Sequence, residues 1–356
     1  MAGVTASEPS DQVLLSSSGG LGRIILNRPR AINALTPAMI EQVSGALGTW
    51  RTDPDVGLVL LTGEGERGLC AGADVRALHR VLVDGETEAA DAFFRTEYAT
   101  NALIGEFAKP IVAVMHGVTM GGGIGVSGHA AVRVVTETSQ LAMPETRLGF
   151  TPDAGGSWLL SRAPGRLGEY LALTSDTMDA ADALHCGFAD FFVPSERVGD
   201  LVDAFETRAD PQTPAELIML FDETPESSRL AREHEWIDDA FAADTVEEIV
   251  ERLRRIGGPR PEAALEALSA RAPLALKVTL EAIRRARGMS TLRDALAQEY
   301  GLVSWFVSSR TDLSEGIRAQ VVDKDFRPDW TPATLAEVSQ ELVAEAFAHR
   351  PTAPLW

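Results

Sequence analysis

The stretch over residues 109–156 constrains the fold of this chain more than any other. It begins with an uncharged apolar run, Ile111–Met115, which predicts a fully buried strand. Glycines let the backbone turn sharply and approach a ligand closely, and here they stand at positions 117, 121, 122, 123, 125 and 128. Two carboxylates, Glu145 and Asp153, follow in short loops that contain proline. This order predicts a water-poor pocket with backbone donors on one side and acid/base groups on the other.

The flanking sequence predicts an α/β protein. Val13–Ser16 and Gly22–Asn27 are typical of strands around a turn over 17–20, and Thr36-Pro37 is typical of a helix start. Val56–Thr62 predicts another buried strand, and residues 117–120 are expected to form a loop. From Gly165 onward the pattern is mainly helical. We therefore expect a disordered tail over 1–11, an α/β core over 12–208, a linker over 210–214 and a carboxyl-terminal helical region over 213–356.

Composition excludes several classes of function. The 356 residues carry a formal net charge of −20, which argues against nucleic acid and against anionic membrane surfaces as partners. The glycines within 111–128 exclude a membrane-spanning helix there. Two cysteines, Cys70 and Cys186, make neither a disulfide framework nor a zinc set, so we expect reduced buried thiols and no metal site. The amino-terminal sequence shows no signal-peptide pattern, and a cytoplasmic location is expected.

Two glycine-rich turns carry the strongest chemical signal. Each of them, Cys70–Ala73 and Gly121–Gly123, follows a buried strand and precedes a predicted helix. Backbone amides from two such turns can form an oxyanion hole for a carbonyl compound. Gly123-x-Gly125-x-x-Gly128 also matches the dinucleotide fingerprint, but these glycines do not directly follow the strand. We therefore expect no nicotinamide or flavin cofactor.

Other polar residues are weaker candidates on sequence alone. Glu97 lies between aromatic positions of a helix predicted over 87–107, where a glutamate is usually solvated. Asp74 is placed to cap a helix predicted over 75–82. Arg28 and Arg30 stand at a strand end, either as phosphate contacts or as solvated loop arginines.

Taken together, the motifs resemble the enoyl-CoA hydratase/isomerase (crotonase) superfamily. The residues that carry the resemblance are CAGAD at 70–74, HGVTMGGGIG at 116–125, MPETRLGFTPDAGG at 143–156 and LTSDTMDAADALHCGFAD at 173–190. FFRTEY at 93–98, PDAGGSWLLSR at 153–162 and SEGIRAQVVDKDFRPDW at 314–330 are closest to its 3-hydroxyisobutyryl-CoA hydrolase branch. The resemblance implies a crotonase-like (ββα)n spiral core. It also implies hydrolysis of an acyl-CoA thioester, 3-hydroxyisobutyryl-CoA in valine breakdown, with coenzyme A as part of the substrate and no separate cofactor.

The resemblance also implies roles for individual residues. Ala73 and Gly122 would donate their amide hydrogens to the thioester oxygen, with alanine where the family often has a second glycine. Glu145 matches the family's catalytic glutamate, Asp153 matches the aspartate that marks the hydrolase branch, and Glu97 matches a glutamate that contacts the acyl hydroxyl. The segments expected to line the CoA site contain Arg28, Ala31, Ala71 and Asp74.

One departure from the family pattern favours hydrolysis over hydration. Hydratases of this superfamily use two glutamates, and the first would fall at Gly125. Glu145 is then left either to attack the thioester, which gives a mixed anhydride, or to activate water. A hydratase or isomerase acting on another acyl-CoA, and a non-catalytic CoA-binding protein, are the alternatives. A homo-oligomer is left open, since superfamily members often trimerise through carboxyl-terminal helices.

Overall fold

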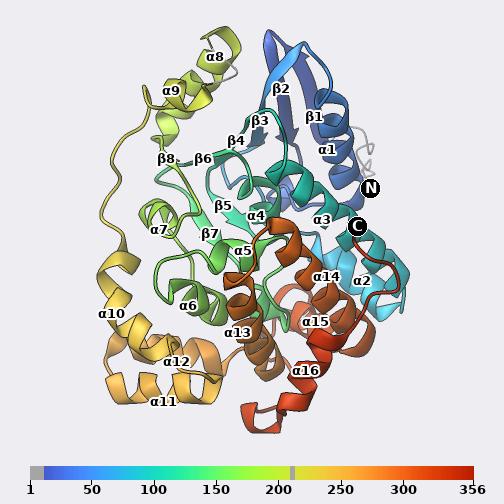
Figure 1. The fold of residues 1–356 in the computed structure, drawn as a ribbon, viewed down its shortest axis with the longest axis vertical. Helices are drawn as coiled ribbons and strands as arrows, with labels where there is room; N and C mark the ends of the chain where they lie inside the picture. Colours follow the sequence, from blue (N-terminus) through green and yellow to red (C-terminus); the bar gives the residue numbers. More distant parts are fainter. Residues whose placement is uncertain (1–11, 209–212) are drawn as a thin grey trace, which may run out of the picture.

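A six-stranded sheet organises the amino-terminal half of the protein (Figure 1). The structure is a computed structural model that describes residues 12–208 and 213–356, so the tail predicted over 1–11 and most of the linker predicted over 210–214 lie outside the described residues. β1 pairs with β2 antiparallel, and the other neighbours in the sheet are parallel. The strands, in their order across the sheet, are β1 (Val13–Ser18), β2 (Gly20–Leu26), β3 (Val56–Gly63), β4 (Ile111–Met115), β6 (Val132–Val135) and β8 (Phe191–Phe192).

The central strands are apolar on both faces because helices cover both faces. All five residues of β4 are buried. Ala113 and Met115 pack on the side of α1 (Pro37–Trp50), whereas Val112 and Val114 pack on the side of α8 (Val198–Arg208) and α9 (Pro214–Ile218). This double coverage is why the strands read as continuous hydrophobic runs. The helix start predicted at Thr36-Pro37 is confirmed, because the Thr36 side chain accepts a hydrogen bond from the Met39 amide.

A second, two-stranded sheet corrects one prediction. Residues 117–120 were expected to form a loop, but β5 (Val118–Met120) pairs in parallel with β7 (Gln140–Ala142). The pairing joins segments more than twenty residues apart, and glycine flanks β5 on both sides, so local sequence gave no strand signal. This small sheet places the second glycine turn at its carboxyl end.

Helices follow most of the strands, and the predicted site residues lie in these helices or in the loops that lead into them. Helix α2 starts after Asp74, whose side chain accepts a hydrogen bond from the Ala77 amide, as predicted. The helices of this part are α2 (Val75–Val83), α3 (Thr87–Gly105), α4 (Gly122–Ser127), α5 (Gly156–Leu160), α6 (Leu167–Thr174), α7 (Ala180–His185) and three 3₁₀ segments, η2 (Pro29–Ala31), η3 (Glu145–Leu148) and η4 (Ser195–Arg197).

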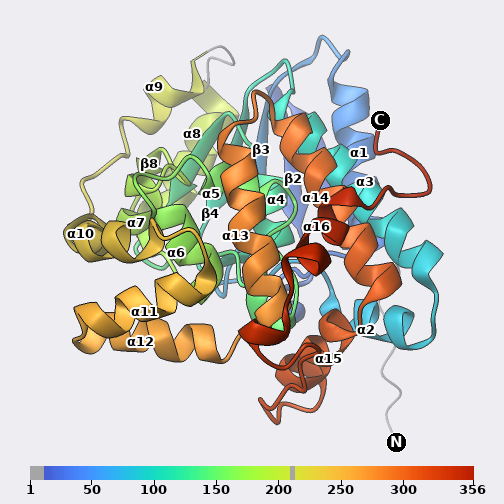
Figure 2. The same cartoon turned by 60° about the horizontal axis from the view of Figure 1, so that its bottom comes forward.

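The carboxyl-terminal part is helical, and two of its helices close over the centre of the molecule (Figure 2). α13 (Pro273–Arg287) and α14 (Leu292–Ser309) share one apolar cluster with α3 and with the segment after η3. The other elements of this part are α10 (Arg229–Phe241), α11 (Val246–Ile256), α12 (Pro259–Ser269), α15 (Asp312–Ile317), the π-helical turn η5 (Arg318–Val322), η6 (Leu335–Glu337) and α16 (Gln340–Ala348). The two cysteines are buried and unpaired. Within the described residues, no helix combines the length and the apolar character that a membrane span needs.

Candidate active site

The two glycine-rich turns lie side by side. The Cys70 amide donates to the Val118 carbonyl at 3.1 Å, and the Met120 amide donates to the Cys70 carbonyl at 3.0 Å. Gly72 adopts φ +100°, in the region that favours glycine, and a Cβ there would lie 3.0 Å from the Met120 oxygen. The turn after β3 and the turn after β5 therefore form one continuous backbone surface.

Two backbone amides, those of Ala73 and Gly122, face the same small space. Neither donates a hydrogen bond to any residue in the described part of the chain. A Cβ built on Gly122 would lie 3.4 Å from the Ala73 nitrogen and would collide with Glu97 Oε1. Gly122 opens α4, where the first amides of a helix have no partner within the helix. The arrangement fits an oxyanion hole, the role predicted for these two amides.

Glu97 is buried and reaches this space from α3, so the solvated alternative for this residue is wrong. Its side chain is 1% exposed, and Oε1 has no hydrogen-bond partner among the described residues. Burial, and then the charge of Asp153, raise the pKa of Glu97 well above its ordinary value. An unpartnered buried carboxyl oxygen is costly to a protein unless a ligand pairs with it.

The Glu145 side chain lies next to the second glycine turn. It is the first residue of η3, and a Cβ on Gly121 would lie 3.0 Å from Glu145 Oε1. The side chain is 6% exposed, and Oε2 has no partner within the described residues. Burial, and then the charge of Asp153, raise its pKa well above the ordinary value.

Asp153 completes a group of three buried carboxyls. Tyr98, one residue after Glu97 on α3, donates its hydroxyl to Asp153 Oδ2 at 3.0 Å. Burial raises the pKa of Asp153 to about 7, although the hydrogen bond from Tyr98 opposes that rise. Each carboxylate disfavours ionisation of its neighbours, so the group is suited to hold an ionised base and a proton donor together.

A fourth buried carboxyl, that of Glu299, supports the loop that carries Asp153. Glu299 belongs to α14, and its oxygens accept the Gly155 amide at 2.6 Å and the Ser157 amide at 2.9 Å, as well as the Ser157 hydroxyl. Glu299 was not identified from the sequence. The available signal was a glutamate on the apolar face of its helix, between Leu296 and Tyr300.

The structure leaves no room for a side chain at Gly125. A Cβ there would lie 2.7 Å from the Ala154 Cβ and 2.9 Å from the Asn101 side-chain amide group. Asn101 comes from α3 and is fully buried. An acidic side chain at position 125 therefore does not fit where α3 packs against α4.

The residues expected to line the CoA site lie together at the edge of the first glycine turn. The Ala71 amide donates to the Ile32 carbonyl at 2.9 Å, and Ala31 and Ala71 are both exposed. Arg28 pairs with Asp74 at 3.0 Å, so this arginine holds two loops together. Contact of these residues with CoA stays a prediction.

An apolar cavity of about 110 Å³ adjoins these loops. Ala73 is among its lining residues, so this apolar space adjoins one of the two unpaired amides. Its lining comes from α2, α3 and the segment before α1, and includes Leu35, Ala73, Leu78, Val81, Ala90 and Phe93.

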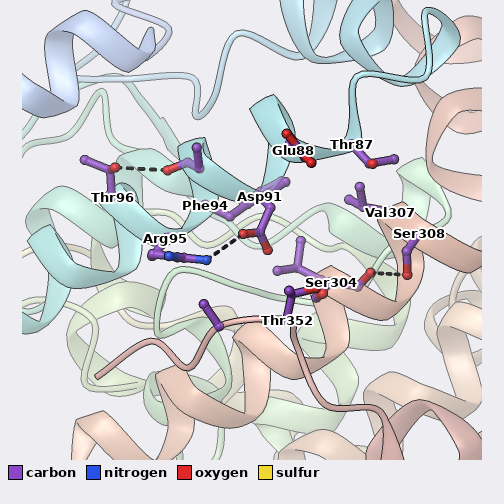
Figure 3. A pocket seen from close by; sticks show the side chains of 13 residues that line it. Thr87, Glu88, Asp91, Phe94, Arg95, Thr96, Ser304, Val307, Ser308 and Thr352 are labelled. Carbon is purple, nitrogen blue, oxygen red and sulfur yellow. Dashed lines mark hydrogen bonds and ion pairs between the residues drawn. The ribbon is translucent and has the colours of Figure 1, made fainter.

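A larger cavity of about 460 Å³ lies between α3 and α14 (Figure 3). Asp91 and Arg95 line it, and Asp91 accepts the Tyr300 hydroxyl at 2.7 Å. None of the predicted site residues lines this cavity.

Comparison with known proteins agrees with the fold. Residues 21–347 match the family model for enoyl-CoA hydratase/isomerase. The chain is 39% identical to the mitochondrial 3-hydroxyisobutyryl-CoA hydrolase of Gallus gallus, over 96% of this chain and 90% of the relative. Two solved structures share the whole architecture. One is a carnitinyl-CoA dehydratase from Mycobacterium thermoresistibile (TM-score 0.92, 43% identity, 97% and 98% of the chains covered). The other is an enoyl-CoA hydratase from Rhodobacter sphaeroides (TM-score 0.89, 42% identity, 95% and 97% covered).

These matches confirm the crotonase-like fold, and they lend no support to the expected cytoplasmic location, since the named relative is mitochondrial. The division into core and helical region, and a homo-oligomer, stay predictions. The family model spans nearly all of the described residues, and the Gallus gallus relative is 39% identical over almost the whole chain. The chain belongs to the enoyl-CoA hydratase/isomerase family.

Proposed function

We propose that this protein hydrolyses an acyl-CoA thioester, with 3-hydroxyisobutyryl-CoA as its substrate. The observation that carries the proposal is the convergence of buried Glu97, Glu145 and Asp153 beside two unpaired amides, with no space for an acid at position 125. The name of the Gallus gallus relative supports the same substrate. A place in valine breakdown stays a prediction.

The thioester oxygen would accept the Ala73 and Gly122 amide hydrogens. Attack on the carbonyl carbon places negative charge on that oxygen, and one such donor stabilises the transition state by about 3 kcal/mol. Collapse of the tetrahedral intermediate breaks the carbon–sulfur bond. The acyl group leaves as a carboxylate after water adds, and CoA leaves as a thiol.

Glu145 and Asp153 have different roles in the reaction. In its ionised form Glu145 either attacks the carbonyl carbon or takes a proton from water, and its raised pKa makes that form a stronger base. Asp153, with its pKa raised to about 7, donates a proton to the departing sulfur. Trapping with hydroxylamine in a single turnover separates the two routes, because only the attack by Glu145 forms a mixed anhydride on the protein.

Glu97 is suited to select a hydroxylated acyl group. Its free Oε1 lies beside Gly122, where the acyl chain would pass. A 3-hydroxyl would satisfy this oxygen, whereas an unhydroxylated chain would leave it unpaired. Glu97→Gln is expected to raise KM for 3-hydroxyisobutyryl-CoA and to change KM for isobutyryl-CoA much less. Equal changes for both esters would contradict this contact.

A hydratase is the second candidate, because two solved relatives carry hydratase or dehydratase titles. Hydration in this superfamily requires a second glutamate, whose place would be Gly125. Asn101 and Ala154 fill the space that its side chain would need. Hydrolysis needs only the carboxyls that are present, and it is the better-supported reaction.

The test is release of free CoA thiol from 3-hydroxyisobutyryl-CoA. We expect release by the parent protein and a loss of about 100-fold or more in kcat for Glu145→Gln and for Asp153→Asn. Glu137→Gln is the matched control, since Glu137 is an exposed carboxylate that bonds only Ser195 among the described residues. No thiol release by the parent, or equal release by all variants, would refute the hydrolase. Absorbance change with crotonyl-CoA would instead support the hydratase.

A further inference from the structure

The loop that carries Asp153 has an unusual backbone. Ala154 has φ +52° and Gly155 has φ +82°, both in the left-handed region. Alanine rarely adopts this conformation, because its Cβ then approaches the following carbonyl oxygen. Side chains from elsewhere must therefore hold the loop in place.

Two side chains hold this loop, the half-buried His129 and the fully buried Glu299. His129 Nε2 lies 2.9 Å from the Ala154 oxygen, and a Cβ on Gly155 would collide with the same ring. Glu299 accepts both the Gly155 and Ser157 amides and the Ser157 hydroxyl. These two amides open α5, so they have no partner within the helix.

We propose that Glu299 is a positioning residue for the thioester hydrolysis: from α14 it fixes the backbone over 153–157 and so holds the Asp153 carboxyl against the Tyr98 hydroxyl. The inference rests on the proposed hydrolase function. Glu299 does not itself face the two unpaired amides. It acts on the reaction through the loop, in the way that outer hydrogen bonds orient groups that touch a substrate.

The chemistry of Glu299 fits this task better than that of an amide. A carboxyl group accepts at both oxygens, so it can satisfy two adjacent backbone amides and a hydroxyl at once. Glutamine has one oxygen and one NH₂ group, so Glu299→Gln must turn a donor toward one of the two backbone amides. The side chain keeps its size, and the apolar packing of α14 is left as it was.

The test compares Glu299→Gln with Gln298→Ala. Gln298 is the preceding residue on α14 and bonds the Ala282 carbonyl at 3.1 Å, so its loss perturbs the helix without touching the 153–157 loop. For Glu299→Gln we expect kcat to fall about 10- to 100-fold with KM almost unchanged. For Gln298→Ala we expect parental kcat and KM. Equal loss in both variants, or an unchanged kcat in Glu299→Gln, would overturn the proposal.

Hydrogen exchange of the amides over 150–161, followed by mass spectrometry on free protein, supplies a readout that needs no substrate. Loss of one carboxyl oxygen as acceptor should speed exchange of the Gly155 and Ser157 amides about tenfold or more in Glu299→Gln, but not in Gln298→Ala. Unchanged exchange in Glu299→Gln would show that Glu299 does not hold the 153–157 backbone in place. If the parent protein released no thiol while exchange accelerated as expected, the proposed hydrolase would fail and the role of Glu299 in the loop would stand.

Discussion

Tyr98 on α3 donates its hydroxyl to Asp153 Oδ2 across 3.0 Å, which joins a long helix to the loop before α5. Both groups are buried, Tyr98 completely. The bond lowers the pKa of Asp153, against the larger effect of burial. Tyr98 thus adjusts the proton affinity of the group proposed to protonate the leaving sulfur.

Replacing Tyr98 by phenylalanine is expected to shift the pH profile upward. Without the hydroxyl, the pKa of Asp153 rises above its value of about 7. A proton donor works below its pKa, so the alkaline fall of kcat should move to higher pH in Tyr98→Phe. The measurement is kcat for CoA release over the pH range in which the protein stays folded. A downward shift, or no shift, would show that Asp153 does not act as the donor.

Gly122→Ala tests the oxyanion hole without removing any donor. The added methyl group would lie 3.4 Å from the Ala73 nitrogen and would displace Glu97 Oε1. We expect a folded protein, because the end of the Glu97 side chain can move, with kcat reduced about 100-fold, as in the loss of one oxyanion donor. Gly199→Ala is a suitable control, since a Cβ there meets nothing within 4 Å. Parental kcat in Gly122→Ala would contradict the role of these amides.

Gly125→Glu should fail to create a hydratase. Its Cβ would lie 2.7 Å from the Ala154 Cβ and 2.9 Å from Asn101, so the α3–α4 contact must open. Overpacking of this kind costs about 1–3 kcal/mol, and a buried extra carboxylate adds to that loss. Thermal unfolding should show a midpoint several degrees below that of the parent. A variant as stable as the parent that hydrates crotonyl-CoA would contradict this account.

Stability should fall as the pH rises through neutrality. Burial raises the pKa of Glu299 from 4.5 to about 8, and that of Asp153 from 3.8 to about 7. The folded protein therefore binds protons that the unfolded chain has released, so this contribution is complete below the unfolded pKa values and is lost by about pH 8. Glu299→Gln should show a smaller drop in melting temperature between about pH 5 and pH 8. A drop as large as that of the parent would show that Glu299 does not titrate in this window.

Local sequence was enough for the elements whose signals are local. The strand at Ile111–Met115, the helix start at Thr36 and the cap at Asp74 all follow from patterns within a few residues. β5 was not predicted because glycine flanks it on both sides and its partner β7 lies about twenty residues further along the chain. Pairing across such a distance leaves no periodic trace in the short strand itself.

The same distinction between local and distant signals applies to the residues of the candidate site. Glu97, Glu145 and Asp153 were identified from motifs, and the structure places Glu97 and Glu145 buried at the second glycine turn with buried Asp153 close to both. Tyr98 and Glu299 were not assigned roles, because a buried polar residue on an apolar helix face resembles ordinary packing until its partner is known. The partner of Glu299 lies 142 residues away in the sequence.

That separation has a consequence for synthesis of the chain. The strands, both glycine turns and Asp153 leave the ribosome well before α14 does. Until Glu299 arrives, the Gly155 and Ser157 amides lack their acceptor, and Ala154 has less to hold it in the left-handed conformation. A nascent chain can thus form its sheet while its hydrolytic centre stays unfinished. The hydrolytic centre is complete only after the last third of the protein, which contains Glu299, has been synthesised.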